Sequence, residues 1–450
     1  MYYSADFMGK YRSTIIDNIE KREEILKKET KSFLNLSHPK WRKMKYILKK
    51  YNPAIVVIYP HKSYNYTSSL LAAKLAKKVL NNVTTIIWNV LGIYDYFISP
   101  PYVDFVIKGN YGDTEYITLK LVKHIKGMKK TYELKKIPNL SFKNKGKIIH
   151  TNVRTLLEDL NKYPIPNRDL TIEKNYYPRF SFGWVEGGRG CKYKCNYCRA
   201  STYYFPPRLI DPKIIIEEIM NVYTKYHTRE FYFYMPSFTL SHKWVKKVCN
   251  LIIRNKLDII FSCYANPKEI TKEIVKVMKR AGCIHIGIGV ESGSEKVLKL
   301  MNRVISKDEV KRAAEIIKNE GIFLSTSTII GYPFENLEDA ISSFLFTLDL
   351  RADMMTFPFF IPHPELSLTT RLRDNKLIKD NNYYQYYSSE PKVKLNKKLL
   401  KYLKEKQMIF NKLAYQMNLL MIKKYTLNPK IMKNKLIEKF YDVILILDRG

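Results

Sequence analysis

The segment SFGWVEGGRGCKYKCNYC, residues 181–198, joins a strand-like apolar pattern to a glycine-rich loop that carries three cysteines. Cys191, Cys195 and Cys198 are three of the six cysteines in the chain, and residues 1–190 contain none. The other three cysteines are scattered through later apolar stretches. This bunching is typical of a metal or cluster site and not of a disulfide framework.

Around this segment, short apolar runs alternate with amphipathic helix patterns. Helix starts are marked by Asp211 before Pro212 and by the capping box of Ser306 and Glu309. Six βα units in series predict a partial (βα)6 parallel barrel, whose chemistry is expected at the carboxyl ends of the strands. The cysteine loop follows the first strand and therefore lies where a site is expected. The strand-like runs cover residues 181–187, 230–235, 258–264, 283–290, 322–331 and 354–362.

The chain before the barrel also alternates strand and helix patterns. Three strand-like runs between residues 53 and 109, with an amphipathic helix at 114–126, predict a small doubly wound, Rossmann-like α/β domain. YPIPNRDL at 163–170 has the composition of a linker. The predicted domains are 1–50, a basic helical segment; 51–170, the α/β domain; 178–375, the partial barrel; and 376–450, a basic helical region.

The spacing Cys-x-x-x-Cys-x-x-Cys suits soft thiolate ligands of a 4Fe-4S cluster. Three thiolates hold three irons, and the fourth iron keeps an open coordination position. Structural zinc prefers four ligands, and the nearest later candidates, His227 and Cys249, are not paired at a zinc spacing. The pattern therefore favours a cluster with Cys191, Cys195 and Cys198 as its ligands.

Further motifs accompany the cysteines. Tyr197 precedes the last cysteine, IGIGVESGSEKVLKLMNR occupies 286–303 and IIGYPFEN occupies 329–336. Together they resemble the radical S-adenosylmethionine superfamily, and in particular the subgroup whose members carry an N-terminal cobalamin-binding domain. The resemblance covers about residues 50–375. It implies a radical enzyme that uses a 4Fe-4S cluster and S-adenosylmethionine.

The resemblance also implies how the cofactors act. The amino and carboxylate groups of S-adenosylmethionine chelate the open iron, and an external flavodoxin or ferredoxin type donor supplies the electron that generates a 5'-deoxyadenosyl radical. Tyr197 would lie near the adenine, while Glu291 and Ser292 would hold the ribose or methionine part. The alternatives are an ordinary packing aromatic at Tyr197 and a buried carboxylate bonded to backbone at Glu291. No catalytic acid, base or radical relay is assigned.

The chain departs from the subgroup in two places. Residues 1–50 contain no strand and no Asp-x-His-x-x-Gly motif occurs, so the cobalamin-binding-like domain is truncated or degenerate, and the sequence leaves cobalamin binding open. The acidic residue that the family places after the second strand is missing, because the chain reads YMPSF at 234–238. Ser237, a backbone carbonyl or another acid would then accept hydrogen bonds from the methionine amino group.

The charge of the chain is strongly positive, with 78 Lys and Arg against 42 Asp and Glu, a net charge of +36. Such a charge favours nucleic acid, an anionic membrane surface or an anionic substrate as partner. An AT-rich genome would enrich lysine equally well, so both interpretations stay open. No apolar run is long enough for a transmembrane span and no export signal is evident, so we expect a cytoplasmic protein.

Three functions are compatible with these patterns. The first is a radical enzyme acting on an unactivated carbon, by methyl transfer if cobalamin binds and otherwise by rearrangement, coupling or ring formation. The second is RNA modification, with tRNA held by the basic surface; methylthio transfer is disfavoured because residues 1–190 lack the cysteines for a second cluster. The third is a non-catalytic or regulatory scaffold, suggested by the missing acid.

Overall fold

The computed structural model describes residues 35–60, 66–90, 92–109, 113–127, 131–154, 158–171, 182–200, 206–378 and 391–407. These residues form two compact units. The first unit comprises the described residues up to Glu158 together with His363–Thr370. The second comprises Asp159–Pro362, Arg371–Asp380 and the described residues from 391 onward.

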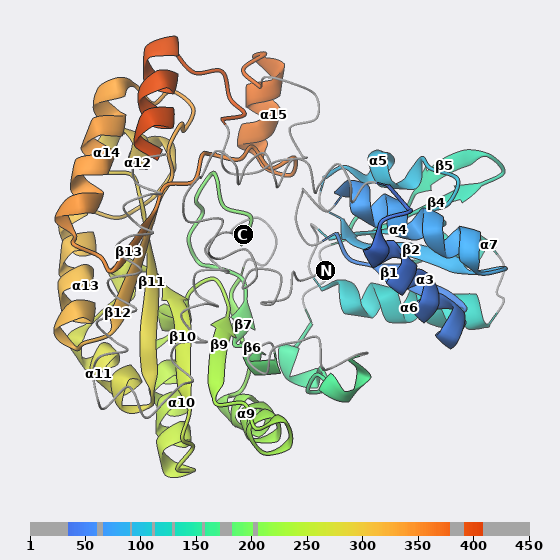
Figure 1. Cartoon of the computed structure of the whole chain (residues 1–450), viewed down its shortest axis with the longest axis horizontal. Helices are drawn as coiled ribbons and strands as arrows, with labels where there is room; N and C mark the ends of the chain where they lie inside the picture. Colours follow the sequence, from blue (N-terminus) through green and yellow to red (C-terminus); the bar gives the residue numbers. More distant parts are fainter. Residues whose placement is uncertain are drawn as a thin grey trace. The chain divides into compact units, whose positions relative to one another are not determined.

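The first unit is built on a mixed sheet of order β1-β2-β3-β4-β5 (Figure 1). Its first three strands are parallel, as the sequence predicts, whereas the last two form an antiparallel hairpin that the sequence reasoning missed. Lys145 and Gly146 at the hairpin turn have φ of 47° and 76°, the left-handed conformation that tight hairpins use. The strands are β1 (Ile55–Ile58), β2 (Thr84–Val90), β3 (Phe105–Lys108), β4 (Leu140–Asn144) and β5 (Lys147–His150).

Helices cover both faces of this sheet, because successive strand residues point to opposite sides. Ile87 and Val106 pack with α4 and α5, while Ile86 and Ile107 pack with α6 and α7. The outermost helix, α3, packs on α4 through Trp41. The helices are α3 (Pro39–Tyr51), α4 (Tyr66–Val79), α5 (Tyr94–Ile98), α6 (Thr114–Lys126) and α7 (Thr131–Leu134).

The second unit contains a six-stranded parallel sheet of order β13-β12-β11-β10-β9-β6. The strands follow one another in the sheet as they do in the sequence, which confirms the predicted partial (βα)6 barrel. A two-residue pairing of β7 (Gly188–Arg189) with β8 (Arg208–Leu209) brackets the cysteine loop. The strands are β6 (Trp184–Glu186), β9 (Glu230–Tyr234), β10 (Ile260–Ala265), β11 (Cys283–Glu291), β12 (Phe323–Thr328) and β13 (Met354–Thr356).

Helices line one side of this curved sheet, as Figure 1 shows for α10, α11, α13 and α14. The predicted caps are present: Asp211 accepts a hydrogen bond from Lys213 N, and Ser306 and Glu309 form a reciprocal capping box. The helices are α9 (Pro212–Tyr226), α10 (His242–Arg254), α11 (Lys272–Arg280), α12 (Glu295–Leu300), α13 (Lys307–Asn319) and α14 (Leu337–Asp349), and α15 (Ser367–Asp374) follows the last strand.

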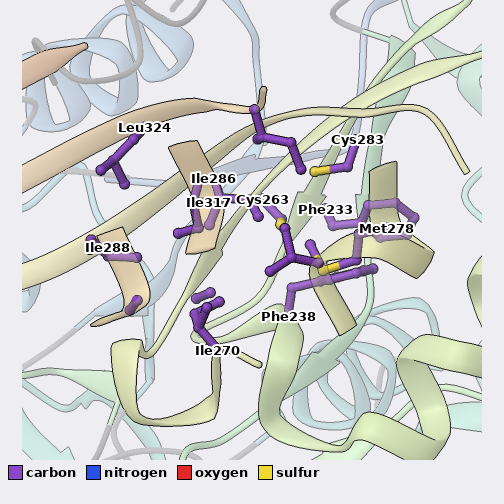
Figure 2. Packing of buried hydrophobic residues seen from close by; sticks show 14 of the residues in the cluster. Phe233, Phe238, Cys263, Ile270, Met278, Cys283, Ile286, Ile288, Ile317 and Leu324 are labelled. Carbon is purple, nitrogen blue, oxygen red and sulfur yellow. The ribbon is translucent and has the colours of Figure 1, made fainter. Parts of the chain in front are cut away.

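The core lies between the sheet and these helices (Figure 2). Phe233, Cys263 and Ile286 point to the helix side from three neighbouring strands, and each is fully buried. Cys249, Cys263 and Cys283 all belong to this core, where burial raises the pKa of the Cys249 and Cys263 thiols. These three cysteines are therefore packing residues.

The basic ends of the chain are described only in part. The helix predicted within 1–50 is present as α3, while residues 1–34 lie outside the described residues. At the other end, residues 397–407 are helical and residues 408–450 lie outside the described residues. Of the helices in the described part, none is long and apolar enough to cross a membrane.

Candidate active site at the cysteine loop

The loop with the three cysteines leaves the sheet at the carboxyl end of β6. Cys195 is buried, and Cys191 and Cys198 are partly exposed. None of the three is in a disulfide among the described residues, and Cys198 N donates a hydrogen bond to Cys195 O at 3.2 Å. Burial raises the pKa of the Cys191 thiol, and nearby Cys195 and Glu269 act in the same direction.

The middle of the loop is fastened to the residues that follow α12. Asn196 donates from its backbone N to Met301 O at 2.9 Å and from its side chain to Leu300 O at 2.9 Å. Asn302 donates from its side chain to Lys194 O at 2.7 Å. The LMNR end of the 286–303 motif thus holds the cysteine loop in place.

Arg303 places a positive charge beside the loop. Its guanidinium lies 4.0 Å from Cys195 Sγ and donates to Gly289 O at 3.2 Å. Arg303 Nε is buried and has no hydrogen-bond partner among the described residues. A fixed cation at this point can offset negative charge on a group bound beside the loop.

Glu291 ends β11 next to Arg303 and Tyr197. Its φ of 64° turns the chain sharply, and Gly289 leaves the space that its carboxylate fills, since a Cβ at Gly289 would come within 2.1 Å of Glu291 Oε1. Burial raises the pKa of Glu291, while Arg303 and a hydrogen bond from Tyr197 oppose that rise. The carboxylate is thus bonded by side chains, and Tyr197, Glu291 and Cys195 lie close together around Arg303. The cofactor contacts expected of Tyr197 and Glu291 stay predictions.

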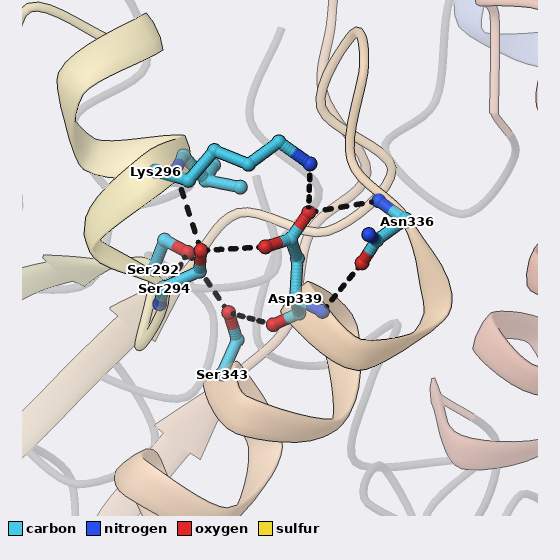
Figure 3. A network of polar contacts seen from close by, with 7 residues as sticks. Ser292, Ser294, Lys296, Asn336, Asp339 and Ser343 are labelled. Carbon is cyan, nitrogen blue, oxygen red and sulfur yellow. Dashed lines mark hydrogen bonds and ion pairs between the residues drawn. The ribbon is translucent and has the colours of Figure 1, made fainter.

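Ser292 points into a different environment. Its hydroxyl is buried and lies 2.9 Å from the Ser343 hydroxyl on α14, within the polar network of Figure 3. Asp339 is central to that network, accepting from Ser294 Oγ and Lys296 Nζ at 2.7 Å each. The network fixes the turn after β11 against α14. The cofactor contact expected of Ser292 stays a prediction.

Glu269 is a site residue that the sequence reasoning missed. It follows β10 and is 7% exposed. Oε2 accepts from Ser237 Oγ at 2.6 Å and Thr239 Oγ1 at 3.0 Å. Oε1 accepts from Tyr193 OH at 3.1 Å and lies 2.9 Å from Lys192 Nζ. This carboxylate therefore lies against the Cys191 end of the loop.

Rings and polar groups line the side of the sheet opposite to the core. His285 Nε2 lies 2.8 Å from Ser325 Oγ, while His285 Nδ1 has no partner among the described residues. Burial lowers the pKa of His285 to about 3, so its ring is neutral at physiological pH. Ring centroids lie 4.9 to 6.4 Å apart along a row that crosses five neighbouring strands: Trp184, Tyr232, Tyr264, His285 and Phe323.

The three loop thiols fit a cluster better than a single ion. No three or more His, Cys, Asp or Glu side chains converge as ligands of one metal ion within the part of the chain that the structure describes. A 4Fe-4S cube spreads its thiolate ligands over three separate irons, so the thiols need to surround a volume and not a point. Three cysteines on one anchored loop, none of them in a disulfide among the described residues, meet that requirement.

A parallel partial barrel with a three-cysteine loop after its first strand is the architecture of iron-sulfur enzymes that form radicals from S-adenosylmethionine. Residues 185–346 match the model of the radical SAM superfamily. The chain therefore carries a radical SAM domain and is an enzyme whose cofactors are a 4Fe-4S cluster and S-adenosylmethionine.

The chain is similar to two known proteins in sequence and to a solved structure in fold. The chain is 28% identical over 359 residues to an uncharacterized methyltransferase of Pyrococcus horikoshii, covering 78% of this chain and 76% of the relative. It is 22% identical over 329 residues to the anaerobic magnesium-protoporphyrin IX monomethyl ester cyclase of Rubrivivax gelatinosus, covering 70% of this chain but only 57% of the cyclase. The cobalamin-dependent S-adenosylmethionine radical enzyme OxsB shares the fold with a TM-score of 0.65 at 16% identity, covering 90% of this chain and 64% of OxsB.

Proposed function

We propose that Cys191, Cys195 and Cys198 bind three irons of the cluster and leave the fourth open to S-adenosylmethionine. The proposal is supported by three cysteines outside any disulfide on a loop that hydrogen bonds anchor to residues 300–302. When bound and reduced, the cluster with S-adenosylmethionine supplies a 5'-deoxyadenosyl radical. The chain's own task is to orient the cofactor and to keep water from the reacting groups.

Tyr197 and Glu291 act on the nucleoside side of the cofactor in this proposal. The hydrogen bond to Glu291 fixes the Tyr197 ring, which can then stack near the adenine, and the carboxylate can accept from ribose hydroxyls. Ser292 contributes by holding the turn after Glu291 against Ser343. The row of rings from Trp184 to Phe323 offers a wall for the substrate on the same side of the sheet.

The reaction that we infer is methyl transfer to an unactivated carbon, with cobalamin held by the first unit. The observation that carries this inference is the match to the Pyrococcus horikoshii methyltransferase, because it extends over most of both chains. The fold shared with cobalamin-dependent OxsB supports the cofactor. The cyclase match supports ring formation as the alternative, although it covers a smaller share of that relative.

One experiment separates these reactions. The full chain is reconstituted anaerobically and incubated with dithionite and methyl-labelled S-adenosylmethionine, with and without hydroxocobalamin. We expect about four irons and four sulfides per chain, together with 5'-deoxyadenosine and with S-adenosylhomocysteine that depends on cobalamin. Formation of 5'-deoxyadenosine alone, independent of cobalamin, would favour ring formation. A colourless protein that binds one zinc would contradict the cluster assignment.

An RNA substrate is a second candidate, favoured by the surface of α3. This helix contains no acidic residue, and Arg42, Lys45, Lys49 and Lys50 are exposed on it with Tyr46. Basic side chains interleaved with an aromatic suit a phosphate backbone and its bases. Fluorescence anisotropy with tRNA should show binding that falls steeply with salt and weakens when Lys45 and Lys49 become Glu. Equal binding of the variant would exclude α3 as the RNA surface.

A further inference from the structure

The segment after β9 provides no carboxylate, and the Ser237 hydroxyl in its place is buried and already bonded to Glu269 and Asn266. Ser237 is 2% exposed, and its hydroxyl donates to Glu269 Oε2 at 2.6 Å. Ser237 Oγ also accepts a hydrogen bond from Asn266 N at 3.0 Å. A hydroxyl has one hydrogen to give and is here used in both directions. The carboxylate at this position is therefore that of Glu269, which lies in the short helical turn Pro267–Glu269 after β10.

Glu269 has two faces with different partners. Ser237 and Thr239, both buried, bind Oε2 and fix the carboxylate from behind. Oε1 faces the loop, where Tyr193 and Lys192 bind it. The Tyr193 hydroxyl donates to Oε1 at 3.1 Å. Both loop partners directly follow Cys191 in the chain, which brings Oε1 to the edge of the cysteine triad.

The Lys192 contact shows that Glu269 Oε1 can bind an amino group. The Lys192 ammonium lies 2.9 Å from Oε1, yet its side chain is 47% exposed. A long lysine side chain loses little by turning its ammonium back to water. Another amino group can therefore take this position without leaving a buried charge unpaired, because Glu269 would exchange one N–H donor for another.

We propose that Glu269 accepts hydrogen bonds from the methionine amino group of S-adenosylmethionine, replacing the acid that is missing after β9. The inference rests on the proposed function, since it requires the iron that the three cysteines would leave open. Lys192 is the resident donor that the cofactor displaces, and Ser237 and Thr239 are positioning residues that hold the carboxylate. Glu269 is thus a binding residue supplied by a different strand.

The test compares binding and cluster content in Glu269→Gln. This change keeps the shape of the side chain and removes its charge. S-adenosylmethionine binding is measured by equilibrium dialysis and by the change it causes in the electron paramagnetic resonance signal of the reduced cluster. We expect an affinity about tenfold to a hundredfold lower with iron content unchanged. 5'-Methylthioadenosine, which lacks the amino group, should bind both proteins equally.

Two further variants sharpen the outcome. Lys192→Ala should bind S-adenosylmethionine at least as tightly as the unmodified chain, because it removes the competing ammonium. Ser237→Asp in the Glu269→Gln background should recover part of the affinity by restoring a carboxylate after β9. Unchanged affinity in Glu269→Gln, or loss of the cluster together with affinity, would overturn the assignment. Failure of the unmodified chain to assemble a cluster would instead overturn the proposed function.

Discussion

Glu269 and Glu291 occupy matching places at the carboxyl ends of two neighbouring parallel strands, β10 and β11. Each carboxylate receives a hydrogen bond from a tyrosine of the cysteine loop, Tyr193 in one case and Tyr197 in the other. Their cationic neighbours differ. The half-exposed Lys192 contacts Glu269, whereas the arginine beside Glu291 is anchored to Gly289 O.

This difference separates an exchangeable carboxylate from a fixed one. Lys192 can return to water, so Glu269 can accept a new amino group at little cost. Arg303 interacts with both the Glu291 carboxylate and the Cys195 sulfur, so moving Arg303 would disturb both groups at once. We therefore infer that the Cys191 end of the loop receives a ligand and that the Cys195 end orients the loop.

The comparison depends first on the cysteine triad, so the largest effect is expected from Cys191→Ala. We expect loss of the cluster and of 5'-deoxyadenosine formation to background, because two thiolates cannot replace three. Cys263→Ala is the matched control in the core, and it should cost about 1 kcal/mol of stability while the cluster is retained. Iron and sulfide analysis with product assays measures both. A Cys191→Ala protein with full iron content would contradict the assignment.

The second prediction sets the two cations against each other. Arg303→Gln should lower the free energy of unfolding by about 2–3 kcal/mol, since it leaves a buried carboxylate without its cation. Lys192→Ala should cost less than about 1 kcal/mol, as for most exposed ion pairs. Denaturant unfolding of the cluster-free chain measures both values. Equal losses would remove the distinction between a fixed and an exchangeable carboxylate.

Sequence reasoning reached Glu291 but not Glu269, and the reason is physical. Glu291 lies within a continuous motif at a strand end, where local pattern and position coincide. Glu269 gains its role from Ser237, 32 residues away, because β9 and β10 pair in parallel. Lys192 and Tyr193 stand in the cysteine motif itself, yet only the loop conformation turns them toward Glu269.

The same contrast holds for the fold. Caps such as Asp211 and the alternation of apolar runs depend on nearby residues, so the barrel could be predicted from sequence. The β4–β5 hairpin could also have been found, since Lys145 and Gly146 separate two short runs that end in Phe142 and begin again at Ile148. Whether the first unit holds cobalamin has no such local signal, because binding depends on how its strand ends are arranged.

The third prediction concerns the space that Gly289 leaves for Glu291. In Gly289→Ala the new Cβ would lie 2.1 Å from Glu291 Oε1, so the carboxylate must rotate away from Tyr197. We expect about tenfold weaker binding of S-adenosylmethionine, equivalent to about 1.4 kcal/mol, or roughly one lost hydrogen bond. Equilibrium dialysis on the reconstituted chain measures the affinity. Unchanged affinity would mean that Glu291 only supports the fold.

The smallest change in S-adenosylmethionine affinity is expected when either tyrosine hydroxyl is removed. Comparing the two variants distinguishes the role of Glu291 from that of Glu269. Tyr197→Phe removes a hydrogen bond that lowers the pKa of Glu291, so that pKa should rise further and S-adenosylmethionine affinity should fall severalfold, on the order of 1 kcal/mol. Tyr193→Phe leaves Glu269 with three kinds of donor, namely Ser237, Thr239 and the amino group of S-adenosylmethionine. The affinity of this variant for S-adenosylmethionine should therefore change about twofold or less. Titrating S-adenosylmethionine at decreasing pH separates the two, because affinity should begin to fall at a higher pH in Tyr197→Phe than in Tyr193→Phe as Glu291 takes up a proton. The opposite order would place the nucleoside at the Cys191 end of the loop and reverse the roles of the two glutamates.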